Sequence, residues 1–344
     1  MTDAPVLVTG GSGFVAGHCI LALLDAGHRV RTTVRSLSRE PDVREVLSQA
    51  GMTRPDALSF VEADLTRDDG WGEAVAGCDH VLHVASPVHT QAVKDEDDVI
   101  RPAREGTLRV LRAARDGGVR RVVLTSALHA VGFGHPPRPG RVFTEDDWSV
   151  LDGPGVDAYG RSKILAEQAA WSFVDTEGGG LELTVLLPVA VMGPVMGPQV
   201  SGANHIVQAS LKGDIPAYPH MYIPVVDVRD VAAAHVAAMT ADGAAGERIL
   251  VTTGAPAMAM QRIGGVLRDR LGERAAKVPT RTLPDLLVRV AARFRADLRP
   301  VAADLHVVKQ VSDAKMRSVL GVAPRPAEEA VAAAGESMIA RSLV

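Results

Sequence analysis

A glycine-rich turn between an apolar run and a helical pattern constrains this chain most. Residues 6–16 read VLVTGGSGFVA, so Gly11, Gly13 and Ala16 fit the spacing G-x-G-x-x-G/A, with Gly10 in front. That spacing places bare backbone amides and a helix N-terminus beside a pyrophosphate group. The pattern lies between a predicted strand and a predicted helix, the context in which it indicates a dinucleotide site. The alternative interpretation is a plain tight turn.

The first half of the chain alternates apolar runs with helical patterns. Strands are predicted over Val6–Thr9, Arg29–Val34, Leu58–Glu62, Asp79–Val84, Arg121–Thr125 and Leu181–Leu187. Apolar residues at helical spacing predict helices over Phe14–Ala26, Asp95–Arg115 and Asp157–Asp175. Several of the strand runs are apolar on both faces, as strands of buried parallel sheets are. We therefore predict an α/β fold of Rossmann type, with a doubly wound parallel sheet.

The composition changes after Pro188, where residues 189–198 are rich in glycine, proline and methionine. Further strands are predicted over Tyr222–Val228 and Arg248–Thr252, separated by a helix over Val231–Thr240. The rest of the chain is mostly helical in pattern. We predict a dinucleotide-binding domain of residues 1–188 plus about 224–254, and a smaller, mostly helical C-terminal substrate domain of about 189–223 and 255–344.

Bulk composition narrows the possible function classes. The 344 residues are 47% hydrophobic, enough for a sizeable core, and carry a formal net charge of −4. Without a basic excess to neutralise phosphates, nucleic acid is not expected as a partner. The two cysteines, Cys19 and Cys78, do not make a disulfide framework, so we expect the protein in a reducing compartment. No signal-peptide pattern or membrane-spanning run is visible, so we expect a cytoplasmic protein without a membrane partner.

The end of the second predicted strand indicates which nicotinamide cofactor the glycine loop binds. NAD sites usually carry an acidic residue there, about 20 positions past the glycines, which accepts a hydrogen bond from the ribose 2′-OH. This chain reads TTVRS over residues 32–36, and the planar guanidinium of Arg35 suits a 2′-phosphate instead. Arg35 therefore predicts NADP, with Ser36 and Arg39 as candidates to assist. The alternative is a solvated arginine after a strand.

Tyr159 and Lys163 lie four positions apart in the first turns of a predicted helix. Positions i and i+4 share a helix face, so the ammonium group is expected near the phenol. A nearby positive charge favours the phenolate and lowers the pKa of the phenol. A phenol tuned in this way can donate its proton to a carbonyl oxygen as a hydride reaches the carbon. We therefore predict Tyr159 as a general acid, against the alternative of a structural tyrosine.

These segments together resemble the extended branch of the short-chain dehydrogenase/reductase superfamily. Within it, the chain is similar to the dihydroflavonol reductase-like group, which includes plant flavonoid reductases and microbial aldehyde and ketone reductases. The matching segments are Val8–Ala16, Thr33–Ser36, Asp64–Leu65, His83–Pro87, Arg121–Ser126, Tyr159–Lys163 and Pro224–Val231. A looser likeness continues through Pro324–Glu329.

The resemblance implies an NADPH-dependent carbonyl reductase acting on a moderately large, apolar ketone or aldehyde. Tyr159 would be the acid, Lys163 would tune it and hold the nicotinamide ribose, and the nicotinamide would lie on Pro188 and Val189. The implied cofactor contacts are Thr9, Gly10, Gly11, Ser12, Gly13, Phe14, Val15, Arg35, Ser36, Asp64, Leu65, Val84, Ala85, Ser86, Thr125, Tyr159, Lys163, Pro188 and Val189. The implied substrate pocket takes in Val88–Gln91, Leu128–Phe133 and Val191–Tyr222, with Pro87, Ala127, His129, Val191, Met192, Met196 and Tyr222 as contacts.

One position departs from the pattern of the group. Its members usually read Thr-Ser-Ser after the fifth strand, and the second serine orients the substrate oxygen, whereas this chain reads Thr125-Ser126-Ala127. Alternation along the strand puts Thr125 on the side of position 127 and Ser126 on the other. We name Ser126 as the catalytic serine on the assumption that the strand breaks at its tip. The other candidate is His129, and the alternative role of Ser126 is a local backbone bond. Residues 104–107 also lack the asparagine that relays protons to the lysine in many relatives.

Several further residues admit either a site role or a packing role. Two roles fit Met192, Met196 and Met221 equally well: a soft apolar wall of the substrate pocket, or filling of the core. Two roles also fit Tyr218, His220 and Tyr222: they shape the substrate pocket, or they pack as aromatic side chains in a proline-rich loop. The 11 histidines show no metal spacing such as H-E-x-x-H, so no metal is predicted. Asp227 and Asp230 are predicted to cap the helix that begins near Val231.

Two other functions stay open at this point. A nucleotide-sugar epimerase or dehydratase on the same scaffold would normally keep NAD bound, and Arg35 argues against it. A sensor that binds NADPH and regulates a partner is compatible with Ala127. Tyr159 and Lys163 argue against a sensor, because it does not need a tuned phenol. The relatives are monomers and dimers, so the chain is expected to be a monomer or a homodimer.

Overall fold

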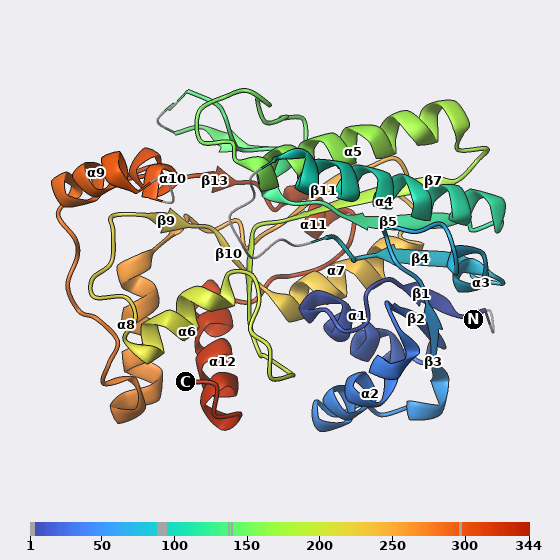
Figure 1. Ribbon diagram of the computed structural model, residues 1–344, viewed down its shortest axis with the longest axis horizontal. Coiled ribbons are helices and arrows are strands. Elements are labelled where there is room, and N and C mark those ends of the chain that lie inside the picture. The colour runs from blue at the N-terminus through green and yellow to red at the C-terminus, as the bar shows by residue number, and fades with distance from the viewer. Residues whose placement is uncertain (1–3, 88–94, 137, 139, 296–297) are drawn as a thin grey trace.

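A parallel sheet forms the centre of the protein (Figure 1). The computed structural model describes residues 4–87, 95–136, 138, 140–295 and 298–344. Within this part of the chain, seven parallel strands run in the order β11-β7-β5-β4-β1-β2-β3. Their bounds are β1 (Val6–Val8), β2 (Val30–Val34), β3 (Leu58–Glu62), β4 (His80–His83), β5 (Arg121–Thr125), β7 (Glu182–Pro188) and β11 (Arg248–Val251). The predicted Rossmann-type, doubly wound sheet is confirmed.

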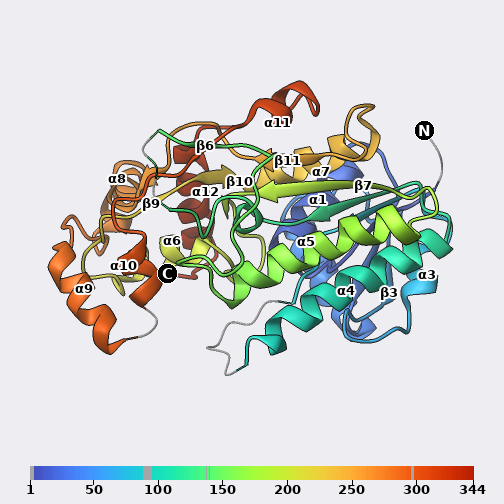
Figure 2. The ribbon, with the colours of Figure 1, turned by 90° about the horizontal axis from the view of Figure 1, so that it is seen from above.

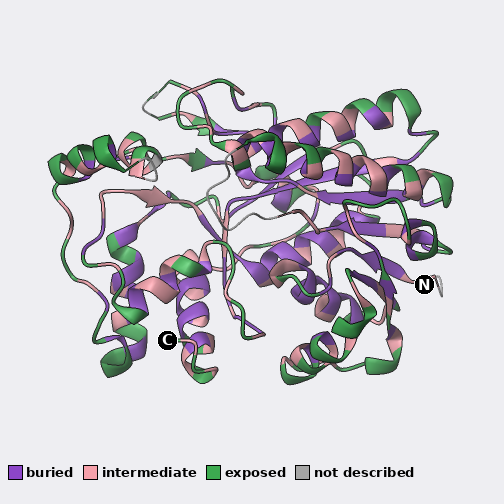
Figure 3. Cartoon of the chain, viewed as in Figure 1, coloured by how far each residue is buried: buried purple, intermediate pink, exposed green. Residues whose placement is uncertain are grey.

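Helices cover both faces of the sheet (Figure 2). On one face, α4 (Asp97–Asp116) packs along α5 (Ala158–Glu177), and on the other α1 (Phe14–Asp25) packs along α7 (Val228–Thr240). The strands between these layers are buried on both sides, as Figure 3 shows. Shorter helices α2 (Glu40–Gln49) and α3 (Trp71–Val75) flank β2 and β3. Among the described residues, no helix combines the length and apolarity needed to cross a membrane.

The strand order reverses between β1 and β4, which defines where a ligand can bind. From β1 the chain builds outward through β2 and β3, and it then returns to place β4 on the other side of β1. The loops that leave the carboxyl ends of β1 and β4 touch, since a Cβ at Gly10 would lie 2.9 Å from the Cβ of Ala85. Ligands of doubly wound sheets bind in the crevice at such a reversal. The fold therefore supports a dinucleotide site at the glycine loop.

A second hydrophobic cluster lies beyond the sheet and involves α6 (Asn204–Lys212), α8 (Met260–Leu271) and α12 (Ala327–Ala340). Around it lie β8 (Ala190–Met192), β9 (Tyr222–Ile223), β10 (Val225–Asp227) and β12 (Met258–Ala259). The remaining elements are β6 (Val142–Phe143), α9 (Asp285–Phe294), α10 (Arg299–Ala303), β13 (Gln310–Val311) and α11 (Ala314–Ser318). Val311 and Met316 belong to the cluster around the main sheet, although they fall in the predicted substrate domain. The domain division stays a prediction.

The stretch predicted as one strand and one helix after Tyr222 differs in detail. The strand is broken at Pro224 into β9 and β10, which pair with different partners, because proline has no amide to donate. The helix α7 begins at Val228, where Asp227 caps it by accepting a hydrogen bond from the Arg229 amide at 2.8 Å. The predicted cap at Asp230 is wrong, because Asp230 lies inside the helix.

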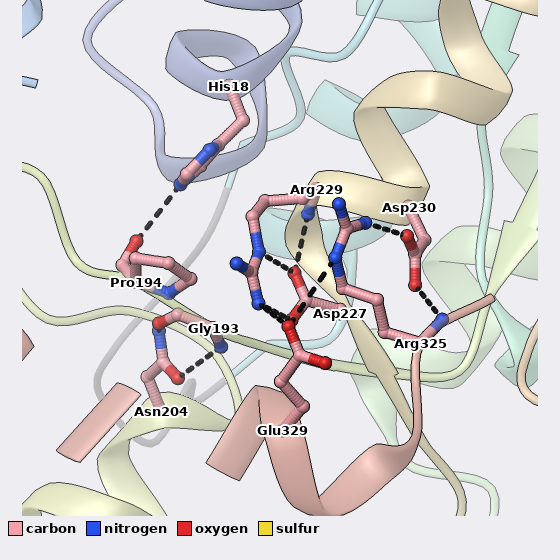
Figure 4. A network of polar contacts seen from close by, with 9 residues as sticks. All are labelled: His18, Gly193, Pro194, Asn204, Asp227, Arg229, Asp230, Arg325 and Glu329. Atoms are coloured by element: carbon pink, nitrogen blue, oxygen red, sulfur yellow. Dashed lines mark hydrogen bonds and ion pairs between the residues drawn. The ribbon is translucent and has the colours of Figure 1, made fainter. Parts of the chain in front are cut away.

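Charged side chains join α7 to the start of α12 (Figure 4). The buried carboxylate of Asp227 accepts from the guanidinium of Arg229 at 2.6 Å, and Arg229 also donates to Glu329 at 3.1 Å. Asp230 pairs with the side chain of Arg325 and accepts from its backbone amide at 2.7 Å. Because α7 packs on the sheet and α12 belongs to the second cluster, these pairs hold the two clusters together.

Candidate active site

Tyr159 and Lys163 lie in the first turns of α5. The carboxylate of Asp157 caps this helix by accepting a hydrogen bond from the Gly160 amide at 2.8 Å. Lys163 Nζ lies 5.8 Å from the centre of the Tyr159 ring, so the two side chains share one face. Tyr159 keeps 37% of its surface exposed, whereas Lys163 is buried. The pair therefore joins an accessible phenol to a buried ammonium group.

Desolvation dominates the pKa values of this pair. Burial lowers the pKa of Lys163 to about 8, and the negative charge of Glu167 opposes the shift. The surrounding protein atoms raise the pKa of Tyr159 to about 12, and the charge of Asp157 acts in the same direction. The predicted net lowering of the phenol's pKa is therefore wrong for this structure, because desolvation and the charge of Asp157 both raise it. Tyr159 keeps its proton at neutral pH.

His129 lies beside Tyr159, in the short turn Leu128–Ala130 that follows β5. Its ring meets the Tyr159 ring edge to face, with centroids 5.0 Å apart and planes at 81°. On its other side it stacks on Phe133 at 4.2 Å. Burial lowers the pKa of His129 to about 4, so the imidazole is neutral at neutral pH. The polar ring of His129 therefore lies next to the phenol of Tyr159. Ala127, at the position of the family's serine, has no hydroxyl group to fill that role.

Thr125 and Ser126 point to opposite faces of the sheet, as alternation predicts. Thr125 Oγ1 shares a hydrogen bond of 2.7 Å with Nε2 of His235 from α7. The Ser126 hydroxyl donates to the buried carboxylate of Glu167 in α5 at 2.6 Å, rather than to local backbone. The other oxygen of Glu167 accepts from Arg248 at 2.6 Å. This geometry favours a structural role for Ser126 over the catalytic role predicted for it.

A small cavity lies between the ends of β4 and β5 and the helices α4 and α5. Its lining residues are Ala85, Ser86, Thr107, Leu124, Thr125, Ser126, Lys163, Ala166 and Glu167. The structure thus brings predicted cofactor residues from three elements to one edge of the sheet, close to Pro188 at the end of β7. Thr107 comes from the segment in which the family asparagine is missing, and its hydroxyl donates to the Ala103 carbonyl at 2.9 Å.

Sequence reasoning missed several residues around this cavity. Glu167 and Arg248 form the ion pair behind Ser126, and His235 holds Thr125. Glu167 lies four positions after Lys163, so helical spacing could have placed it on the same face. Nothing local in the sequence points to Arg248 or His235, because their partners are distant along the chain.

The glycine loop leaves the start of α1 open to an anion. Gly10 has φ +75°, which only glycine adopts freely. A Cβ at Gly11 would lie 2.4 Å from Thr32 Oγ1, so a side chain does not fit there. Gly13 caps α1 with no side-chain hydrogen bond from the described residues, and the first turn carries no acidic residue. The first amides of the helix are therefore left for a ligand, which fits the pyrophosphate of a dinucleotide.

Arg35 and Asp64 follow β2 and β3, the strands that lie on the other side of β1 from β4. Arg35 follows β2 with its side chain exposed, beside a turn that Ser36 caps. Asp64 follows β3 and accepts from the amide and the hydroxyl of Thr66, both at 2.8 Å. Those hydrogen bonds, with smaller contributions from Arg67 and Arg35, hold the pKa of Asp64 below its usual range. Arg35 is therefore close enough to Asp64 to lower its pKa, and among the described residues no side chain pairs with its guanidinium, which leaves that group available to an anion.

The seven residues predicted to contact substrate separate into a buried set, which consists of Ala127, Met192 and Met196, and a half-buried set. Met192 has no exposed surface and belongs to the second hydrophobic cluster. Met196 packs on α1, since its Cε lies 2.6 Å from where a Cβ of Gly17 would be. Core filling therefore fits both methionines, and the structure does not place them in a pocket. The other set is half-buried and consists of Pro87, His129, Val191 and Tyr222. The predicted segment Val88–Gln91 lies outside the described residues.

A profile of the NAD dependent epimerase/dehydratase family matches residues 6–252. The chain is 36% identical to Cinnamoyl-CoA reductase 1 of Arabidopsis thaliana over 249 residues, which cover 71% of this chain and 69% of that protein. It is 37% identical to Dihydroflavonol 4-reductase of Hordeum vulgare over 198 residues, which cover 56% of this chain and 54% of that protein.

A solved structure extends the similarity over nearly the whole length. Gre2 from Candida albicans, solved in complex with NADPH, superimposes with a TM-score of 0.80 at 26% sequence identity. The match covers 98% of this chain and 99% of that chain. The likeness therefore includes the C-terminal elements that lie beyond residue 252.

Proposed function

Because the chain belongs to the NAD dependent epimerase/dehydratase family, and within it to the extended short-chain dehydrogenase/reductases that resemble dihydroflavonol reductase, we propose that it reduces the carbonyl group of a moderately large, apolar ketone or aldehyde. The protein is an NADP-dependent oxidoreductase, since the relatives are named reductases and Gre2 binds NADPH. The observation that carries the carbonyl chemistry is the position of Tyr159 and Lys163 on α5, at the sheet edge that also carries the glycine loop.

The residues of the crevice fit the parts of the cofactor. The open amides in the first turn of α1 would hold the pyrophosphate, and the exposed guanidinium of Arg35 would meet the 2′-phosphate. Lys163 would hold the nicotinamide ribose, and Pro188 and Val189 would line the nicotinamide. When bound, NADPH supplies a hydride to the carbonyl carbon.

The proton comes from this chain. Tyr159 is protonated at neutral pH and partly exposed, so it can donate its proton to the carbonyl oxygen. Lys163 is mostly charged at neutral pH, and its ammonium group stabilises the phenolate that is left. The neutral imidazole of His129, which lies edge to face with Tyr159, would donate a second hydrogen bond to the same oxygen. We assign it the role that Ala127 cannot fill.

Arg35 weighs against the epimerase alternative. Enzymes of that type retain NAD, and the acidic residue that would hold its ribose is absent from the end of β2. The exposed phenol of Tyr159 weighs against a sensor, because a protein that only binds NADPH does not need a proton donor beside a buried cation. The substrate class stays a proposal, because it depends on the pocket and not on the fold.

A substrate panel tests the proposed function. NADPH absorbance is followed with aryl ketones, ketoesters and aldehydes, and each is repeated with NADH. We expect turnover of apolar carbonyl compounds with NADPH preferred. Loss of the charge-assisted bond in Arg35→Ala should reduce that preference by about 10- to 100-fold, whereas Arg274→Ala, at an exposed arginine far from the crevice, should leave it unchanged. Equal rates with NADH, or NAD co-purified and not released, would contradict the proposal.

A further inference from the structure

Three side chains that are distant in sequence meet one another, and none of the three lines the cavity beside Lys163. His220 Nδ1 lies 2.7 Å from one carboxylate oxygen of Asp285, and His306 Nε2 lies 2.6 Å from the other. The two imidazole rings stack with centroids 4.9 Å apart. One ligand atom from each side chain lies within 4.8 Å of the others. In the part of the chain that the structure describes, this is the group of His, Cys, Asp and Glu residues close enough to share an ion.

Backbone hydrogen bonds hold the three contributing segments together. The His306 amide donates to the His220 carbonyl at 2.8 Å. Two residues before His220, the Tyr218 amide donates to the Arg281 carbonyl at 3.0 Å, and the Leu283 amide donates back to the Tyr218 carbonyl at 2.8 Å. Tyr218 itself is fully buried. The positions of the three ligand side chains are therefore fixed by the main chain and do not depend on contacts between the side chains alone.

His306 adopts an unfavourable backbone conformation at this point. Its φ is +61°, in the left-handed region that residues with a Cβ rarely adopt. Among the described residues, Ser342 near the C-terminus is the other non-glycine residue with a positive φ. This conformation lets the His306 amide reach His220 while its imidazole reaches Asp285. Backbone strain of this kind tends to persist where a site requires it.

The donor set has a defined metal preference. Two imidazole nitrogens and one carboxylate suit Zn²⁺ and similar divalent transition metals, whereas Ca²⁺ and Mg²⁺ prefer oxygen ligands throughout. His220 and Asp285 are half-buried and His306 is exposed, so water can reach the remaining coordination positions. The spacing of the ligands resembles no sequence motif, because they come from the loop before β9, the first turn of α9 and the segment before β13.

We propose that His220, Asp285 and His306 bind one divalent transition-metal ion of the Zn²⁺ type, with water completing its coordination. The ion would fasten α9, which lies at the end of the molecule remote from β3, to the loop before β9 (Figure 1). It would also fix the segment that continues to Lys309, whose Nζ lies 4.5 Å from the centre of the Phe133 ring. The role is structural, and binding does not depend on the proposed carbonyl reduction.

Metal titration of the full chain tests the proposal. The protein is prepared without a histidine tag, which would itself bind metal, and is treated with chelator. Co²⁺ is then added while visible absorption is recorded. We expect saturation at one equivalent, with Zn²⁺ displacing the Co²⁺ signal. His306→Ala and Asp285→Asn each remove a ligand, so they should weaken binding by more than the roughly 10- to 100-fold that loss of an outer-shell partner typically costs. His205→Ala, at an exposed histidine in α6, should bind as the wild type does.

Thermal unfolding provides an independent readout. Zn²⁺ should raise the unfolding temperature of the wild type and of His205→Ala, and should leave that of Asp285→Asn unchanged. Asp285→Asn keeps the size of the side chain, so a folded variant is available if His306→Ala fails to fold. Absence of saturable Co²⁺ binding by the wild type, or equal binding by Asp285→Asn, would overturn the proposal and leave a hydrogen-bonded His-Asp-His cluster.

Discussion

Replacing His129 with phenylalanine isolates the contribution of its ring nitrogens. Phenylalanine keeps an aromatic ring against Phe133, where the imidazole now stacks at 4.2 Å with planes 9° apart. It also keeps an edge against Tyr159, where the centroids are 5.0 Å apart. The main loss is therefore one hydrogen-bond donor to the oxygen on which negative charge develops. Removal of one such donor typically lowers kcat by about 10²- to 10³-fold, or about 3–4 kcal/mol. Because Tyr159 still donates, we expect a loss near 10²-fold.

The assay separates this effect from cofactor binding and from stability. Steady-state NADPH oxidation gives kcat, and NADPH fluorescence gives the dissociation constant, which should not change in His129→Phe. The control is Ser126→Ala, which loses a buried hydrogen bond to the carboxylate of Glu167. It should lower the free energy of unfolding by about 1.5–3 kcal/mol while kcat stays close to the wild-type value. A wild-type kcat in His129→Phe, together with a large loss in Ser126→Ala, would refute the assignment and restore Ser126.

Three further predictions follow from the pKa shifts and the glycine loop. Burial brings the pKa of Lys163 to about 8, so kcat/KM for reduction should fall as pH rises through 8, and Lys163→Arg, which stays protonated, should lose that break in its pH profile. Burial lowers the pKa of His235 from 6.5 to about 4, so the unfolded chain binds the proton first on acidification. The free energy of unfolding in urea should therefore decrease from pH 6.5 to 4, and it should decrease less in His235→Gln. Gly10→Ala combines φ +75° with a Cβ only 2.9 Å from that of Ala85 and should weaken NADPH binding in a fluorescence titration. Gly51→Ala, with φ +95° and no neighbouring atom of the described residues within 4 Å of the added Cβ, should cost about 1 kcal/mol of stability or more and leave NADPH binding unchanged.

The sheet could be predicted because its signals are local. Val122–Leu124 is apolar on both faces, and the glycines at the first turn require an adjoining strand and helix, so neither inference needs distant contacts. What failed depends on partners that are remote in sequence. Pro224 divides a predicted strand because β9 and β10 pair with different strands. Asp230 resembles a helix cap in sequence, but it pairs with Arg325.

The active site shows the same limit. The i, i+4 spacing of Tyr159 and Lys163 is local, and α5 has both residues on one face. The direction of the pKa shift of Tyr159 could not be predicted, because that shift depends on how many protein atoms surround the phenol. The hydrogen bond from Ser126 to Glu167 forms only if α5 packs against β5 at one particular position along the strand, which the local sequence does not determine. The cluster around Asp285 has no local signal, because its ligands lie on three separate segments.

The central claim, that Tyr159 donates the proton, is tested most directly by single-turnover NADPH oxidation in Tyr159→Phe with a carbonyl substrate identified from the panel. Phenylalanine keeps the ring beside His129 and removes the hydroxyl group. Loss of a positioned general acid should slow the reaction by about 10²- to 10⁴-fold, with NADPH binding within a few-fold of the wild type. Tyr218→Phe, at a fully buried tyrosine whose hydroxyl donates to Ser210 at 2.8 Å, should retain most of the rate. A Tyr159→Phe rate within a few-fold of the wild type would contradict the claim.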